Sequence, residues 1–83
     1  MIRLRLFGKF GDLAGERGEL MVPAQGIEQV ADVYRYIATV APALHREITS
    51  PQVLVAVNQE IVPLDARVGE GDELAILPPV TGG

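Results

Sequence analysis

The spacing of hydrophobic residues changes twice along this chain of 83 residues, and the order of those changes restricts its fold. Five segments are predicted to be strands, most clearly where hydrophobic residues alternate with a period of two, as is typical of strands with one buried face, and at 53–57 because that run is apolar and rich in β-branched residues. These segments are 2–6, 20–22, 53–57, 60–62 and 73–77. Between 27 and 41 the apolar residues recur at helical spacing instead, and Pro42 is expected to end that helix. The composition of 43–47 leaves open whether a short extra turn follows.

Two strands, one main helix and three more strands are typical of an α+β domain whose helix crosses one face of a mixed sheet. This is the outline of the beta-grasp, or ubiquitin-like, fold. In that arrangement the first and last strands, 2–6 and 73–77, lie side by side in the middle of the sheet. We expect one beta-grasp domain over 1–79 and a flexible Gly-Gly tail over 80–83, because the chain is too short for a second core.

The composition excludes several classes of site and partner. The absence of cysteine excludes disulfides, thiolate metal sites, cysteine nucleophiles and persulfide carriage. Seven basic against eleven acidic residues give a net charge of −4, which argues against nucleic acid as a partner. No stretch approaches the ~18 apolar residues of a membrane span, and the first residues lack the pattern of a signal peptide. We therefore expect a cytoplasmic protein that contacts no membrane.

The usual patterns of catalytic and metal-binding residues are missing. His45 is the only histidine and Ser50 the only serine, so we expect neither a Ser-His-Asp triad nor a multi-histidine metal site. We interpret His45 as a partly exposed loop residue. Gly8, Gly11 and Gly15 lack the spacing of a dinucleotide or phosphate loop, and we interpret them as a flexible turn. The chain is expected to hold no metal and to bind no cofactor by itself.

The segment 78–83, Pro-Pro-Val-Thr-Gly-Gly, is the unusual feature, although a frayed end is its simplest interpretation. Pro78 and Pro79 would stiffen the base of the segment, while Gly82 and Gly83 could pass through a channel too narrow for other residues. The four residues beyond Pro79 reach about 13 Å at ~3.3 Å each. That reach would place a terminal carboxylate inside a partner's active site.

A terminal carboxylate is inert until it is activated, and the general route is an acyl-adenylate made with ATP. A separate enzyme would have to make it, because the chain has no nucleotide loop. Since no cysteine can hold a persulfide, any sulfur that the chain carries must sit on Gly83 as a thiocarboxylate.

Several segments match a known family. They are 57–59 (Val-Asn-Gln), 71–75 (Gly-Asp-Glu-Leu-Ala), the ending 78–83, the opening 2–7 and the segment 13–15 (Leu-Ala-Gly). With these segments the chain resembles, over nearly its whole length, the MoaD/ThiS family of ubiquitin-like sulfur carriers. Within that family it is most similar to the small subunits of molybdopterin synthase.

The resemblance implies a non-catalytic subunit of a sulfurtransferase complex. An activating enzyme would use ATP to adenylate Gly83, a sulfur donor system would convert it to a thiocarboxylate, and the tail would enter a large catalytic subunit. There it would donate sulfur to cyclic pyranopterin monophosphate, forming molybdopterin during molybdenum cofactor biosynthesis. The resemblance also implies a heterotetramer in which two small subunits flank a dimer of large ones. The segment entering the partner would consist of Pro78, Pro79, Val80, Thr81, Gly82 and Gly83.

Alternation also predicts a docking surface. If residues 2, 4, 6, 74 and 76 face the helix, then Phe7, Ala75 and Leu77 lie on the opposite face of the sheet, near the tail. We hypothesise that Phe7 and Leu77 help to bind the large subunit and the activating enzyme. The alternative is that both side chains lie under a loop.

Three other functions stay open at this point. A related carrier would send thiocarboxylate sulfur to thiamin thiazole or transfer RNA, although the Pro-Pro-Val-Thr ending argues against these relatives. A ubiquitin-like modifier would be joined through Gly83 to lysines of other proteins, since Lys9 is the only lysine here. A noncovalent binding module would tolerate an extra residue after Gly83, whereas a carrier would not.

Overall fold

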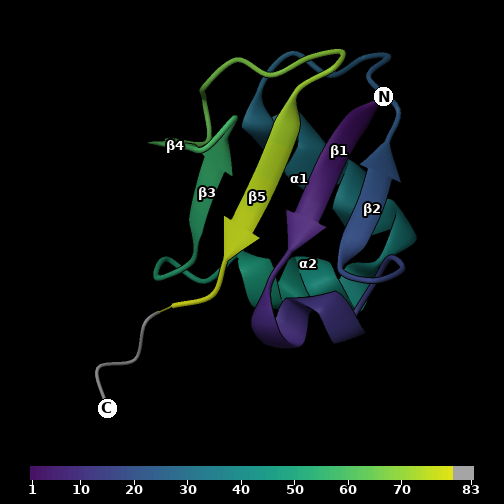
Figure 1. The fold of residues 1–83 in the computed structure, drawn as a ribbon, viewed down its shortest axis with the longest axis vertical. Helices are drawn as coiled ribbons and strands as arrows, with labels where there is room; N and C mark the ends of the chain where they lie inside the picture. Colours follow the sequence, from purple (N-terminus) through teal and green to yellow (C-terminus); the bar gives the residue numbers. More distant parts are fainter. Residues whose placement is uncertain (80–83) are drawn as a thin grey trace.

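A computed structural model describes residues 1–79 of the chain (Figure 1). Its strands form one sheet in the order β2-β1-β5-β3-β4, and α1 and α2 lie against the same face of it. The strands are β1 (Ile2–Leu6), β2 (Glu19–Val22), β3 (Leu54–Val57), β4 (Glu60–Val62) and β5 (Glu73–Leu77). The helices are α1 (Val30–Val40), α2 (Pro42–Ile48) and the 3-10 helix η1 (Gly8–Asp12). The predicted beta-grasp fold, with a mixed five-stranded sheet and a main helix across one face, is confirmed.

Strands β1 and β5 form the centre of the sheet and are its one parallel pair in residues 1–79. Leu4 lies opposite Leu74, and Leu6 lies opposite Ile76. Because the pair is parallel, both strands finish at the same end of the sheet, which we call the exit end (Figure 1). The predicted central position of the first and last strands is therefore confirmed.

Helix α1 occupies most of the predicted 27–41 segment but begins at Val30. Gln29 has an extended backbone, with φ −139° and ψ 167°, so the helix starts after it. The Asp32 carboxylate accepts hydrogen bonds from the backbone N–H groups of Glu28 (2.9 Å) and Gln29 (3.1 Å). These bonds hold the pKa of Asp32 below its usual value and place a negative charge in the first turn, where the helix dipole favours it.

A second helix, α2, follows directly after Ala41. Pro42 ends α1 as predicted, but it also begins α2, because proline is tolerated in a first turn whose N–H groups have no partner. Leu44 and Ile48 lie one turn apart on α2 and are both buried. His45 is half-buried on this helix, so its predicted place in a loop is wrong. Among residues 1–79, no helix has both the length and the apolar character that crossing a membrane requires.

The core lies between the sheet and the helices. Its strand residues are buried as alternation predicts: Ile2, Leu4, Leu6, Leu74 and Ile76. Helix α1 contributes its one apolar face: Val30, Val33, Tyr34 and Ile37. The glycine-rich segment after β1 is not a simple flexible turn, since η1 buries the Phe10 side chain completely. The sequence did not identify Phe10 as a core residue. A 3-10 helix of five residues has too few turns to show a periodic pattern of hydrophobic residues.

Tyr34 is expected to make folding stability fall at alkaline pH. Burial raises the pKa of its hydroxyl to about 12, whereas a tyrosine in the unfolded chain titrates near ~10. The folded state therefore holds this proton more tightly, and the resulting stability is complete below pH ~10 and is lost as pH rises through ~12. We expect the unfolding free energy of the native sequence to fall by about 2 kcal/mol more than that of Tyr34→Phe over this range.

Urea denaturation at a series of pH values measures this difference. Tyr36→Phe makes the same chemical change on the same helix but leaves Tyr34 in place, so it should keep the native alkaline loss. If the unfolding free energy of Tyr34→Phe fell at alkaline pH as much as that of the native protein, the fall would not come from the Tyr34 hydroxyl.

Candidate functional site

The base of the predicted tail lies at the exit end of the sheet. Pro78 directly follows β5 and packs against Gly8, which comes just after β1. The Pro78 Cγ lies 3.4 Å from the position that a Cβ on Gly8 would take. Pro78 and Pro79 are both half-buried, so the chain leaves the sheet along a partly packed path. The other predicted tail residues lie outside the described residues: Val80, Thr81, Gly82 and Gly83.

Apolar side chains gather on the outer face of the sheet, the face opposite the two helices. Leu54 on β3 lies opposite Leu77 on β5, and Ala56 lies opposite both Ala75 and Ile61. Residues paired across neighbouring strands share a face, so these side chains form one continuous surface. We define the outer-face patch as Phe7, Leu54, Ile61, Ala75 and Leu77. Large apolar side chains are strongly exposed in it, with 51% exposure at Leu54 and 54% at Ile61.

The structure places Phe7 and Leu77 as the sequence predicts. Phe7 is 39% exposed and Leu77 is half-buried beside Leu54. Neither is fully covered by a loop, so the alternative interpretation does not describe them. Their predicted role in binding partners stays a prediction.

Two arginines on the outer face have different surroundings. Arg3 lies between two carboxylates, 3.6 Å from Glu73 and 4.0 Å from Glu19. The Arg5 guanidinium carbon instead lies 5.5 Å from the centre of the Phe7 ring, in the range of a cation–π contact. Arg5 forms no salt bridge with any residue of 1–79. The outer-face patch therefore carries a positive charge that the described part of the chain does not neutralise.

Sequence reasoning missed Leu54 and Ile61. The apolar run 53–57 has no alternation that distinguishes its two faces. The face on which each of its residues lies is known only from the register between the strands. A signal was present, because Asn58 and Gln59 form a two-residue hairpin turn with φ of +50° and +73°. Such a turn pairs the residues on either side of it, and hence places Ile61 opposite Ala56.

Two of the family-like segments meet at the end of the sheet opposite the exit end. The Asn58 side chain donates to the Asp72 carboxylate (3.1 Å) and accepts from the Glu73 backbone N–H (3.0 Å). Asp72 also accepts from the Gly69 N–H (2.8 Å). These bonds tie the β3–β4 turn to the loop before β5. Asn58 and Asp72, one from each segment, thus have a structural role at the end of β5 that is far from the tail.

The described residues do not assemble a metal centre. No group of three or more His, Cys, Asp or Glu side chains in 1–79 is placed to hold an ion. Glu70 forms an ion pair with the Met1 amino group, and Asp72 is occupied by the hydrogen bonds above. The exit end therefore presents an exposed apolar surface beside the start of the 78–83 segment.

Comparisons with known proteins cover nearly the whole chain. The model of the ThiS family matches residues 4–83. The molybdopterin synthase sulfur carrier subunit of Escherichia coli is 30% identical over 100% of both chains. The human molybdopterin synthase sulfur carrier subunit is 31% identical over 99% of this chain and 93% of its own. The crystal structure of SAMP1 from Haloferax volcanii has a TM-score of 0.82 and is 30% identical, covering 99% of this chain and 98% of that one.

Proposed function

The chain belongs to the ThiS family, and from this membership we propose that it is the sulfur carrier subunit of a molybdopterin synthase. The observation that carries the proposal is the similarity along the full chain to two sulfur carrier subunits of that enzyme. The position of Pro78 at the exit end supports it, because the segment that follows begins beside an exposed apolar surface.

The proposed chemistry takes place on Gly83, as the last residue of the carrier. In an activating enzyme, a Gly83 carboxylate oxygen attacks the α-phosphorus of ATP, forming an acyl-adenylate and releasing pyrophosphate. Sulfide (HS⁻) delivered by the donor system then attacks the acyl carbon, the bond from that carbon to the phosphate oxygen breaks to release AMP, and Gly83 is left as a thiocarboxylate. In the large catalytic subunit, that sulfur is transferred to cyclic pyranopterin monophosphate, and water returns Gly83 to a carboxylate. The carrier supplies the sulfur, while its partners supply the ATP site and the acid–base groups.

The outer-face patch is the proposed docking surface for both partners. Its members Phe7, Leu54 and Leu77 lie at the same end of the sheet as Pro78, so a partner bound there is within reach of the last four residues, which extend at most about 13 Å. Arg5 lies over the Phe7 ring without a carboxylate partner in residues 1–79. A partner surface that fits is therefore apolar at its centre, with an acidic side chain positioned to meet Arg5.

Leu77→Asp is expected to weaken binding to the large subunit by about 30-fold or more. The change places a charge in the middle of an apolar interface, and the loss of a central contact typically costs at least ~2 kcal/mol. Leu54→Asp should also weaken binding to the large subunit. It is less of a risk to folding, because the Leu54 side chain is already 51% exposed. Titration calorimetry measures both affinities.

Val40→Asp is the control for these variants. Val40 is 50% exposed, but it lies on α1, on the other side of the sheet. It should bind like the native protein, and thermal melts should show that all three variants are folded. Native affinity in folded Leu77→Asp would count against the docking role.

Mass spectrometry of the C-terminal peptide tests the proposed function. The protein should be isolated under conditions that preserve thiocarboxylates, both with and without the activating enzyme. Exchange of oxygen for sulfur at Gly83 has nearly the same nominal mass shift as oxidation of Met1 or Met21, so the shift must be localised. Sulfur on Gly83 that disappears without the activating enzyme is the expected result. A plain carboxylate in the presence of active enzyme and sulfur donor would overturn the proposal.

A protein modifier is the second candidate, favoured by the similarity to SAMP1, a small archaeal modifier protein. In that case Gly83 would form an amide with a lysine of another protein. Self-linked chains have one side-chain amine available, that of Lys9, which pairs with Glu47 at 3.2 Å. Tryptic peptides bearing the Gly83 end on target lysines would indicate the modifier, and sulfur transfer to the pterin precursor would indicate the carrier.

A further inference from the structure

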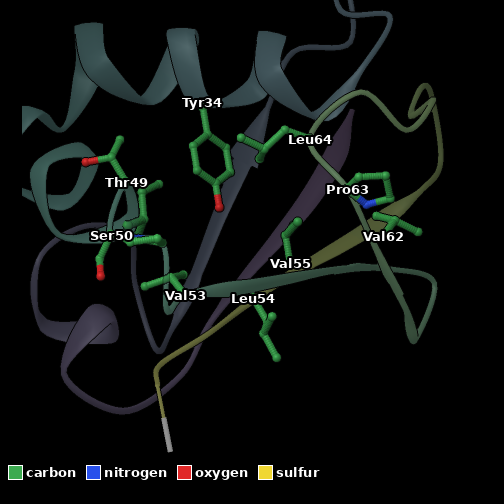
Figure 2. Close-up of a pocket in the computed structure, with 11 residues that line it drawn as sticks. Tyr34, Thr49, Ser50, Val53, Leu54, Val55, Val62, Pro63 and Leu64 are labelled. Carbon is green, nitrogen blue, oxygen red and sulfur yellow. The ribbon is translucent and has the colours of Figure 1, made fainter.

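A cavity of about 290 Å³ lies between the helices and the β3–β4 hairpin (Figure 2). Its walls are formed mainly by aliphatic side chains of α2, the β3–β4 hairpin and the loops beside them. The main apolar lining residues are Ile48, Val53, Val55, Val62 and Leu64. The polar side chains that line it are hydroxyls, those of Tyr34, Thr49 and Ser50, and none of its lining residues carries a charge. The cavity is thus neutral and largely apolar.

The Tyr34 hydroxyl is the distinctive group of the cavity. Tyr34 is a residue of α1 with 8% exposure, and its ring points from the helix across the cavity toward β3 (Figure 2). Its hydroxyl has no hydrogen-bond partner among the side chains and backbone of residues 1–79. No buried side-chain nitrogen or oxygen atom of residues 1–79 lacks a hydrogen-bond partner, so the unpartnered Tyr34 hydroxyl is open to solvent through the cavity. The hydroxyl therefore marks a point where a ligand can form a hydrogen bond.

We propose that this cavity binds a small, neutral ligand with the size of one substituted aromatic ring and a hydrogen-bond acceptor that meets the Tyr34 hydroxyl. This site shares Leu54 with the outer-face patch but is otherwise formed by different residues, and it does not depend on the proposed sulfur-carrier function.

The volume of the cavity limits the size of the ligand, and its neutral lining side chains determine the charge of the ligand. A cavity of about 150 Å³ in another protein holds benzene, so twice that volume accommodates a ring with a short substituent. A charged ligand would lose its hydration without gaining a counter-charge, because every lining side chain is neutral. Burial holds the pKa of Tyr34 at about 12, so its hydroxyl remains protonated at neutral pH and acts as a donor.

Acetophenone and toluene are the probes that test this site. Both carry one ring, but acetophenone adds a single carbonyl acceptor. Titration of the full-length protein, followed by the amide signals in ¹H–¹⁵N spectra, should give saturable shifts around residues 48–55 and 62–64. Tyr34→Phe should weaken acetophenone binding by about 2- to 12-fold, the loss of one neutral hydrogen bond, and leave toluene binding within about 2-fold. Tyr36→Phe, which changes a tyrosine outside the cavity, should leave both affinities unchanged.

A second variant keeps the proposal falsifiable if Tyr34→Phe alters the fold. Val53→Phe places a ring into the cavity from a half-buried wall position and should reduce the affinity for both probes by at least about 10-fold. Three outcomes would overturn the proposal. They are the absence of saturable shifts up to the solubility limit, shifts centred on Phe7, Ile61, Ala75 and Leu77 instead of the cavity, and equal effects of Tyr34→Phe on both probes.

Discussion

One alanine added after Gly83 is expected to reduce thiocarboxylate formation by at least about 100-fold. The proposed adenylation uses the carboxylate of residue 83, and the extra residue moves that carboxylate by about 3.3–3.6 Å. A displacement of ~1 Å at a reacting centre can already cost about 100-fold in rate. The added methyl group also widens a tip that is otherwise two glycines. Pyrophosphate release in the presence of the activating enzyme, together with the mass of the C-terminal peptide, measures the loss.

Docking should survive this extension. The outer-face patch is unchanged, so binding of the extended protein to the activating enzyme should stay within about 3-fold of native affinity, as for an unaltered interface. An alanine added before Met1 is the matched control, since it lengthens the chain equally at the other end and should permit normal sulfur loading. Sulfur loading of the C-terminally extended protein at the native rate would show that the reaction does not use the Gly83 carboxylate.

The second large effect is expected at Gly15, where an alanine should destabilise the fold by about 3–5 kcal/mol. Gly15 has φ +79°, and a Cβ there would lie 2.7 Å from the Glu19 carbonyl carbon and closer still to its oxygen. That oxygen accepts a hydrogen bond from the Glu16 N–H (2.9 Å), and the Glu19 N–H donates to Glu16 in return (2.9 Å). An alanine would therefore have to break the turn that leads into β2.

Gly26→Ala separates the cost of a steric clash from the cost of the left-handed backbone conformation. Gly26 has φ +81°, but no atom lies within 4 Å of the position that its Cβ would take. Its loss should be limited to about 1–2 kcal/mol, the cost of a left-handed conformation for alanine. Urea denaturation followed by circular dichroism gives both values. Equal losses in the two variants would show that the contact with Glu19 does not matter.

The sequence predicted best the elements in which hydrophobic residues recur at a clear and regular spacing. In 2–6 and 73–77 a hydrophobic residue at every second position determined both the strand and its buried face, because the side-chain period of a strand is two. A helix was predicted over 27–41 for the same reason, because apolar residues recur there at helical spacing, and the structure places α1 at Val30–Val40. The short helices were not established in this way: η1 was not predicted, and for α2 the sequence left open a short extra turn at 43–47, because helices of five and seven residues have too few turns to show a period. The burial of Phe10 depends on η1.

For the candidate site, the sequence alone was enough to predict the chemistry of the tail. Without cysteine or a nucleotide loop, the prediction is that a carboxylate on Gly83 is the reactive group, and it stays a prediction because 80–83 lie outside the described residues. The sequence also placed Phe7 and Leu77 on the outer face, since alternation within one strand is a local property.

Which side chains meet depends on the tertiary structure. The outer-face patch gains Leu54 and Ile61 through pairing between strands, and Pro78 reaches Gly8 because β1 and β5 are parallel. The cavity beside Tyr34 arises where α1, α2 and the β3–β4 hairpin pack without filling the space between them. The physical reason is the same in each case: periodicity acts between neighbours along the chain, whereas contacts across strands and between layers depend on register and packing over long separations in sequence.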